Sequence, residues 1–148
     1  MIKSYRGLLA NEGQNRIRLR TKDGKTGYRI AKFQVIPENP YAAADKELVF
    51  KVYKTQQGTP DGVIDFSDQT LIAAATYSDS DGSAAPVTQY SESVIFDNEV
   101  INQDIYVTYV DKHGSQSGNY YIELETVELS DTQAAQTTLK ALRTLASR

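Results

Sequence analysis

Three arginines stand at alternate positions, and their spacing is the clearest chemical feature of the chain. Arg16, Arg18 and Arg20 are interleaved with Ile17 and Leu19. In a β-strand this alternation places the three guanidinium groups on one face and the two aliphatic side chains on the other. Three like charges on one face repel one another unless carboxylates lie close. We therefore expect an acidic partner for this arginine row (residues 16, 18 and 20), either in the same chain or in a neighbouring copy.

The charges of the chain are divided along its length. Residues 1–54 hold 12 Lys and Arg against 5 Asp and Glu, a net charge of +7, and residues 55–148 hold 4 against 14, a net charge of −10. The arginine row therefore has three readings: carboxylates of the same chain balance it, it contacts another protein, or it grips nucleic-acid phosphates. A pI near 5.2 disfavours nucleic acid as the partner.

The single histidine lies in a turn rich in Gly and Ser. His113 is followed by Ser115 and Ser117, which allows a Ser-His-Asp arrangement to be considered. A nucleophile elbow needs Ser at the centre of Gly-x-Ser-x-Gly and a helix after it, whereas Gln116 occupies the centre here and a strand pattern follows. We interpret His113 as an exposed turn residue and predict that the protein is not an enzyme and has no catalytic residues.

Carboxylates offer two further kinds of site. Asp79, Asp81 and Ser83 alternate as calcium ligands would, but Tyr90 stands where a calcium-binding loop needs Glu. We therefore expect solvated turns, with no metal and no cofactor. Glu123 and Glu125 share a strand face, and we expect them to face the arginine row in an adjacent strand or an adjacent copy.

Short alternating segments separated by turn residues predict an all-β fold. The length of 148 residues fits one domain, and the absence of Cys excludes disulfides and thiolate metal sites. We predict a single antiparallel β-sandwich of jelly-roll character over residues 1–129. Its eight strands are expected at residues 2–8, 15–21, 28–36, 47–55, 70–77, 88–96, 104–110 and 119–129.

Details within the strands add three expectations. Asp23-Gly24 is typical of a tight hairpin, because Gly supplies the positive φ that such a turn requires. Alternation breaks near Ala31, which indicates a β-bulge. Residues 105–110 are apolar on both faces, which predicts a central strand or one covered by a partner.

The last residues change to a helical period. Ser130 and Gln133 match a capping box, and we expect one helix over residues 132–146. An apolar stripe on that helix is formed by Ala135, Leu139, Leu142 and Ala146, with Leu145 alongside. This segment, residues 130–148, is predicted to pack on the sandwich or on a neighbouring subunit. We expect no signal peptide and no transmembrane segment.

Three segments carry a resemblance to a known group of proteins: residues 27–33, the Tyr-rich strand at 118–125, and the closing helix at 130–148. Together they resemble the small β-sandwich virion proteins of tailed bacteriophages, especially marine ones. The resemblance implies a structural role in the virion, as a capsid decoration (cement) protein or as a small tail or neck component. It also implies assembly in the host cytoplasm, contacts with other virion proteins, and self-association.

We expect the contacts of such a protein to use its cations and its helix leucines. The candidate interface residues are Arg16, Arg18, Arg20, Lys25, Arg29, Leu139, Leu142 and Leu145. An alternative is a carbohydrate-binding fibre module that would use Tyr77, Tyr90 and the polar loop at 78–86. The absence of Trp counts against that alternative.

Overall fold

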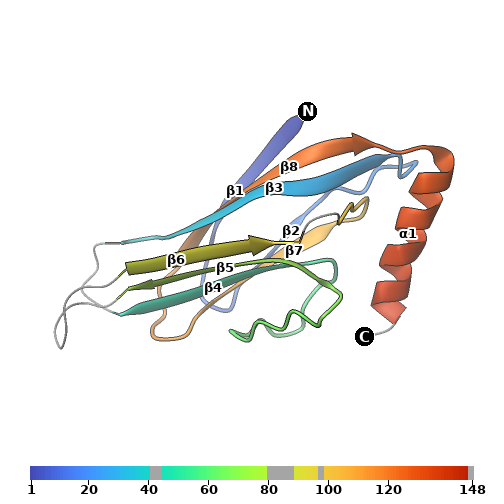
Figure 1. Cartoon of the computed structure of the whole chain (residues 1–148). Coiled ribbons are helices and arrows are strands. Elements are labelled where there is room, and N and C mark those ends of the chain that lie inside the picture. Colours follow the sequence, from blue (N-terminus) through green and yellow to red (C-terminus); the bar gives the residue numbers. More distant parts are fainter. Residues whose placement is uncertain (41–44, 80–88, 97–98, 147–148) are drawn as a thin grey trace.

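Two antiparallel sheets face each other, and a helix stands at one end of the pair (Figure 1). The structure is a computed structural model and describes residues 1–40, 45–79, 89–96 and 99–146. The strands are β1 (Ile2–Leu9), β2 (Gln14–Ile17), β3 (Thr26–Pro37), β4 (Lys46–Tyr53), β5 (Leu71–Asp79), β6 (Gln89–Ile95), β7 (Ile105–Asp111) and β8 (Gly118–Glu128), and the helix is α1 (Asp131–Ala146).

One sheet has three strands in the order β1-β8-β3, and the other has five in the order β2-β7-β4-β5-β6. Each predicted strand overlaps an observed one, so the expected β-sandwich with a C-terminal helix is confirmed. Jelly-roll character is not confirmed. In the described residues β6 pairs with β5 of the larger sheet rather than adding a fourth strand beside β3.

Strand β8 is the centre of the smaller sheet and pairs with β3 along its whole length and with β1 from Gly118 to Glu125. Its register against β3 shifts between Ile30 and Lys32, which confirms the bulge expected near Ala31. Strand β7 lies between β2 and β4 and is buried on both faces, as its apolar pattern predicts for a central strand.

The prediction of a tight hairpin at Asp23-Gly24 is correct for the conformation of Gly24 and wrong for the hairpin. Gly24 has a φ of 68°, as predicted. The segment is not a hairpin, because β2 before it pairs with β7 and β3 after it pairs with β8. The turn therefore carries the chain from the larger sheet to the smaller one.

The core between the sheets is built around an aromatic stack. The rings of Phe50 and Tyr109 lie with centroids 4.4 Å apart, and Tyr120 is tilted against Phe50 at 6.4 Å. The Tyr109 hydroxyl donates to the carbonyl of Gln116 at 2.6 Å, so its burial leaves no unpaired donor. Gly118 packs directly under this stack, since a Cβ there would lie 2.8 Å from the Phe50 ring.

The outer face of the larger sheet is covered by the segment that joins β4 to β5. Lys51 of β4 points to that face, yet its side chain is only 2% exposed. Its ammonium group donates to Asp61 at 2.8 Å and to the carbonyl of Val63, and it lies 5.4 Å from the centre of the Tyr53 ring. A buried ammonium group needs such partners, so Lys51 holds the segment onto the sheet.

Helix α1 begins as the capping box predicts. The Gln133 amide donates to the Ser130 hydroxyl at 3.2 Å, and the Ser130 amide donates to the Gln133 side-chain oxygen at 3.0 Å. Asp131 lies in the first turn, where a negative charge interacts favourably with the positive end of the helix dipole.

Replacing Gly118 with Ala should destabilise the protein by about 2 kcal/mol, because the added methyl group must displace buried aromatic rings. A loss of this size lowers Tm by about 6 °C in a chain of this length. Thermal unfolding followed by circular dichroism measures the change. Gly58→Ala is the matched control, since no atom lies within 4 Å of a Cβ at Gly58. Equal effects of the two substitutions would contradict the packing described here.

Candidate docking surface

The arginine row lies at the end of β2. The strand itself ends at Ile17 rather than at residue 21, but the alternation continues beyond it. Ile17 and Leu19 are 4% and 2% exposed, whereas Arg16, Arg18 and Arg20 are exposed. The predicted division of charged and aliphatic side chains between two faces is therefore confirmed.

One carboxylate organises this row. Oδ1 of Asp104 accepts the backbone amides of Leu19 at 2.9 Å and Arg20 at 3.0 Å. Oδ2 accepts the Arg16 Nε at 2.8 Å and also pairs with Arg16 Nη2. The acidic part of the chain thus balances Arg16, while the guanidinium groups of Arg18 and Arg20 form no ion pair within the described residues.

The same contacts keep Asp104 ionised. Partial burial opposes ionisation, but the hydrogen bonds from the Arg20 amide, the Arg16 guanidinium and the Leu19 amide outweigh it and hold the pKa of Asp104 below its ordinary value. Asp104 therefore fixes the backbone of the row at neutral pH.

The other predicted cations separate into two places. Lys25 forms an ion pair with Asp131 at 2.8 Å and so joins the start of β3 to the first turn of α1. Arg29 lies on the outer face of the smaller sheet, where its register partner is Glu125. Neither residue belongs to the arginine row.

The placement of the two strand glutamates corrects an expectation. Within the chain, Glu123 and Glu125 do not face the arginine row, because β8 pairs with β1 and β3 and not with β2. Their register partners in β3 are Lys32 and Arg29. Whether they meet the row of another copy stays a prediction.

The helix turns a different face to the sandwich from the one its apolar residues predict. Ala134 is buried, and Thr138 accepts the side-chain amide of buried Asn102 at 2.9 Å. That amide also donates to the carbonyl of Gly24 at 3.0 Å. Because Asn102 needs polar partners, the helix presents small and hydroxyl residues to it.

The predicted apolar stripe consequently faces away from the sandwich. Leu139 and Leu142 are 51% and 52% exposed, and Ala135 is exposed as well. The side chains of Leu145 and Ala146 lie outside the described residues. The two described leucines are thus accessible to a partner.

A groove brings two arginines of the row and the helix together. Its volume is about 400 Å³, and its lining includes Arg16, Arg20, Tyr106 and Leu142. Two predicted groups of interface residues, more than 100 positions apart in sequence, therefore border one hollow. Sequence reasoning missed Asp104 and Asn102, which position these groups. No local pattern marks them, since their contacts with the helix and with the arginine row lie 32 to 88 residues away.

The residues considered for catalysis and for metal binding have the following placement. His113 is exposed and contacts Glu47 at 3.1 Å, which confirms the exposed turn histidine. The described residues contain no group of His, Cys, Asp or Glu that could hold a metal ion. Asp79 bonds to Lys46 and Tyr77, and Asp81 and Ser83 lie outside the described residues. The one helix in the described part of the chain is too short and too polar to cross a membrane.

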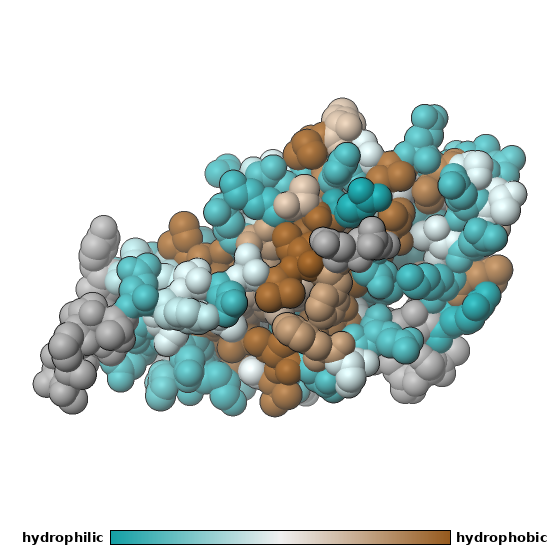
Figure 2. Space-filling model, in the orientation of Figure 1, coloured by the Kyte–Doolittle hydropathy of each residue, from teal (hydrophilic) through white to brown (hydrophobic). Residues whose placement is uncertain are grey.

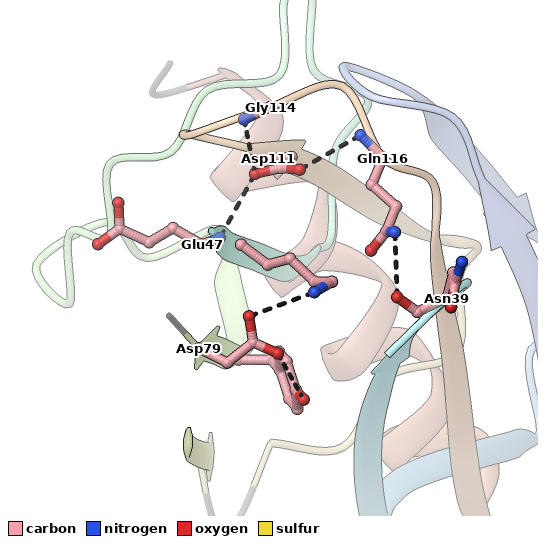
Figure 3. A network of polar contacts seen from close by, with 8 residues as sticks. Asn39, Glu47, Asp79, Asp111, Gly114 and Gln116 are labelled. Atoms are coloured by element: carbon pink, nitrogen blue, oxygen red, sulfur yellow. Dashed lines mark hydrogen bonds and ion pairs between the residues drawn. The ribbon is translucent and has the colours of Figure 1, made fainter. Parts of the chain in front are cut away.

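A polar network at the opposite end of the sandwich from α1 has a structural role (Figure 3). The buried carboxylate of Asp111 accepts the amides of Gly114 at 3.2 Å, Gln116 at 3.3 Å and Glu47 at 3.4 Å. The Gln116 side chain in turn donates to the carbonyl of Asn39 at 3.1 Å. Together with a bond from the His113 amide at 3.1 Å, they hold the loop between β7 and β8 and give both carboxylate oxygens of Asp111 hydrogen-bond partners.

Comparison with known proteins does not assign the chain to a family. No family model matches it, and no curated protein is similar to it at a significant level. The resemblance to phage virion proteins therefore remains a prediction, and the functional argument depends on the surface described above.

Replacing Asp104 with Asn should lower the free energy of unfolding by about 2 kcal/mol at neutral pH, because hydrogen bonds to a charged carboxylate are lost. The native pKa of Asp104 is depressed, so its contribution is present at neutral pH and is lost as the pH falls below about 4. Urea unfolding at a series of pH values should show the two proteins converging in acid. Glu38→Gln, which alters an exposed carboxylate, should show no such difference. A gap between wild type and Asp104→Asn that persists at low pH would contradict this role.

Proposed function

We propose that the protein is a non-enzymatic structural component of a virion, and specifically a capsid decoration protein that stabilises contacts between capsid subunits. The observation that carries the proposal is the groove at the end of the sandwich. There Arg16 and Arg20 lie beside Leu142, Arg18 is exposed between them in the chain, and the guanidinium groups of Arg18 and Arg20 have no ion-pair partner within the described residues. A surface that combines arginines with exposed aliphatic side chains suits a protein–protein contact.

The rigid frame under this surface supports a binding role. Asp104 fixes the backbone of the row, and the capping box and Asn102 fix the first turns of α1. A backbone that is already fixed loses less conformational entropy when a partner binds. A small tail or neck component would use the same surface, and we include self-association in the proposal.

The carbohydrate-binding alternative is less well supported. It needs aromatic rings that a sugar can reach, but Tyr77 is buried and its hydroxyl donates to Asp79 at 3.1 Å. Tyr90 is exposed, whereas residues 80–86 of the loop considered for this role lie outside the described residues. A single exposed tyrosine offers too little aromatic surface for a sugar ring to stack on.

The double substitution Arg18→Glu and Arg20→Glu should reduce binding to virus particles by about tenfold or more, since both guanidinium groups are available to acidic partners. The fold should persist, because neither side chain pairs within the described residues. Co-sedimentation with density-gradient-purified particles from the host that produces this chain measures the binding. Thermal unfolding checks the fold.

Arg6→Glu with Lys32→Glu is the matched control, since it makes the same charge change on the outer face of the smaller sheet. Absence of the wild-type protein from purified particles would overturn the virion proposal. Normal binding of the Arg18 and Arg20 double variant would overturn the assignment of the surface.

A further inference from the structure

A second and larger groove lies on the other side of Lys54, and no sequence pattern pointed to it. Its volume is about 530 Å³. It is bordered by the C-terminal half of α1, by the segment after β4 and by the end of β6. The residues that matter for its chemistry are Lys54, Phe66, Leu71, Phe96, Glu99 and Arg143.

One wall of this groove is apolar and open. Phe66 is 58% exposed, and its ring meets Phe96 edge to face with centroids 5.2 Å apart. Val63 and Ile64, just before it in the chain, are also exposed. Figure 2 shows hydrophobic side chains gathered from the end of β6 down to the segment below it. An exposed cluster of this kind marks a site of interaction.

The opposite wall is cationic, and its acidic residues are already engaged. Glu99 pairs with Lys54 at 2.9 Å and with Lys140 at 3.5 Å. Burial opposes the ionisation of Glu99, but the two lysines outweigh it and hold its pKa below the ordinary value. The Asp68 carboxylate accepts the amide and the hydroxyl of Thr70 at 2.9 Å and 2.6 Å.

This leaves an excess of positive charge. Lys54 and Lys140 are matched to Glu99, whereas Arg143 forms no ion pair with any described residue. Arg143 lines the same groove as Phe66 and Phe96. A ligand that carries a carboxylate beside an apolar side chain could pair with Arg143 and pack on Phe66 and Phe96 at the same time.

We propose that this groove binds an acidic peptide segment in which carboxylates flank an apolar side chain. The apolar side chain packs on Phe66 and Phe96, and a carboxylate pairs with Arg143. A nucleic-acid backbone brings a charge with every nucleotide, whereas the described lining offers a single cation, Arg143, that has no ion-pair partner, so a nucleic acid fits this groove less well. The site goes beyond the proposed virion role and does not depend on it.

Fluorescence anisotropy with a labelled synthetic peptide, Ser-Glu-Phe-Glu-Leu-Glu-Ser, tests this site. We expect saturable binding that weakens as salt rises. Two matched peptides separate the contributions: Ser-Gln-Phe-Gln-Leu-Gln-Ser keeps the apolar side chains, and Ser-Glu-Ser-Glu-Ser-Glu-Ser keeps the charges. Each should bind about fivefold or more weakly, as expected when an ion pair or an apolar contact is lost.

Variants of the protein locate the binding. Arg143→Glu and Phe66→Ser should each raise the Kd for the acidic apolar peptide by about fivefold or more. Both side chains are exposed, so both proteins should fold. Arg6→Glu and Ile36→Ser make matching changes at exposed positions of the smaller sheet and should leave the Kd within about twofold.

Three results would overturn the inference: no binding of the acidic apolar peptide, equal binding of the uncharged peptide, or unchanged binding by both groove variants. A labelled oligo-dT that binds more tightly than the peptide would also overturn it and would identify a nucleic-acid site. If the protein binds the peptide but is absent from virus particles, the peptide site is supported and the virion proposal is overturned.

Discussion

Three lysines with buried side chains constrain how residues 1–54, the basic part of the chain, pack against residues 55–148, the acidic part. The side chains of Lys46, Lys51 and Lys54 are 3%, 2% and 7% exposed. An ammonium group removed from water without a partner costs several kcal/mol, so each must meet a carboxylate. The partners are Asp79, Asp61 and Glu99, which come from three different later segments.

The division of charge along the sequence therefore has a structural meaning. Cations of the first 54 residues pair with carboxylates of the remainder at these three positions, and again at Arg16 with Asp104 and Lys25 with Asp131. Internal balance thus accounts for a large share of the segregation. Among the described cations that form no ion pair, Arg18, Arg20 and Arg143 are the ones that border the two candidate surfaces. All three lie near the end of the sandwich where α1 stands, and the proposals above concern this end.

Much of the fold could be predicted from local patterns, because alternation of side chains and turn residues are properties of neighbouring positions. The eight strands, the bulge at Ala31 and the helix cap at Ser130 are of this kind. The buried side of α1 could not be predicted, since it is selected by Asn102 rather than by the leucines of the helix. The candidate docking surface also divides into a part that local patterns predict and a part that they do not. The arginine row follows from spacing, whereas the contact with Asp104 depends on a pairing 88 residues away.

The strand order also has a consequence for how the protein acquires its structure. Strands β1 and β3 pair only with β8, and β2 pairs only with β7, among the described residues. The first three strands to leave the ribosome therefore have no partners until the last two have been made. Pairings over such sequence separations are slow to form, because a long loop must close before any contact compensates for its entropy. Folding of this sandwich therefore waits for β7 and β8, and a chain that stops short of β8 would leave strands β1 and β3 unpaired and exposed to aggregation.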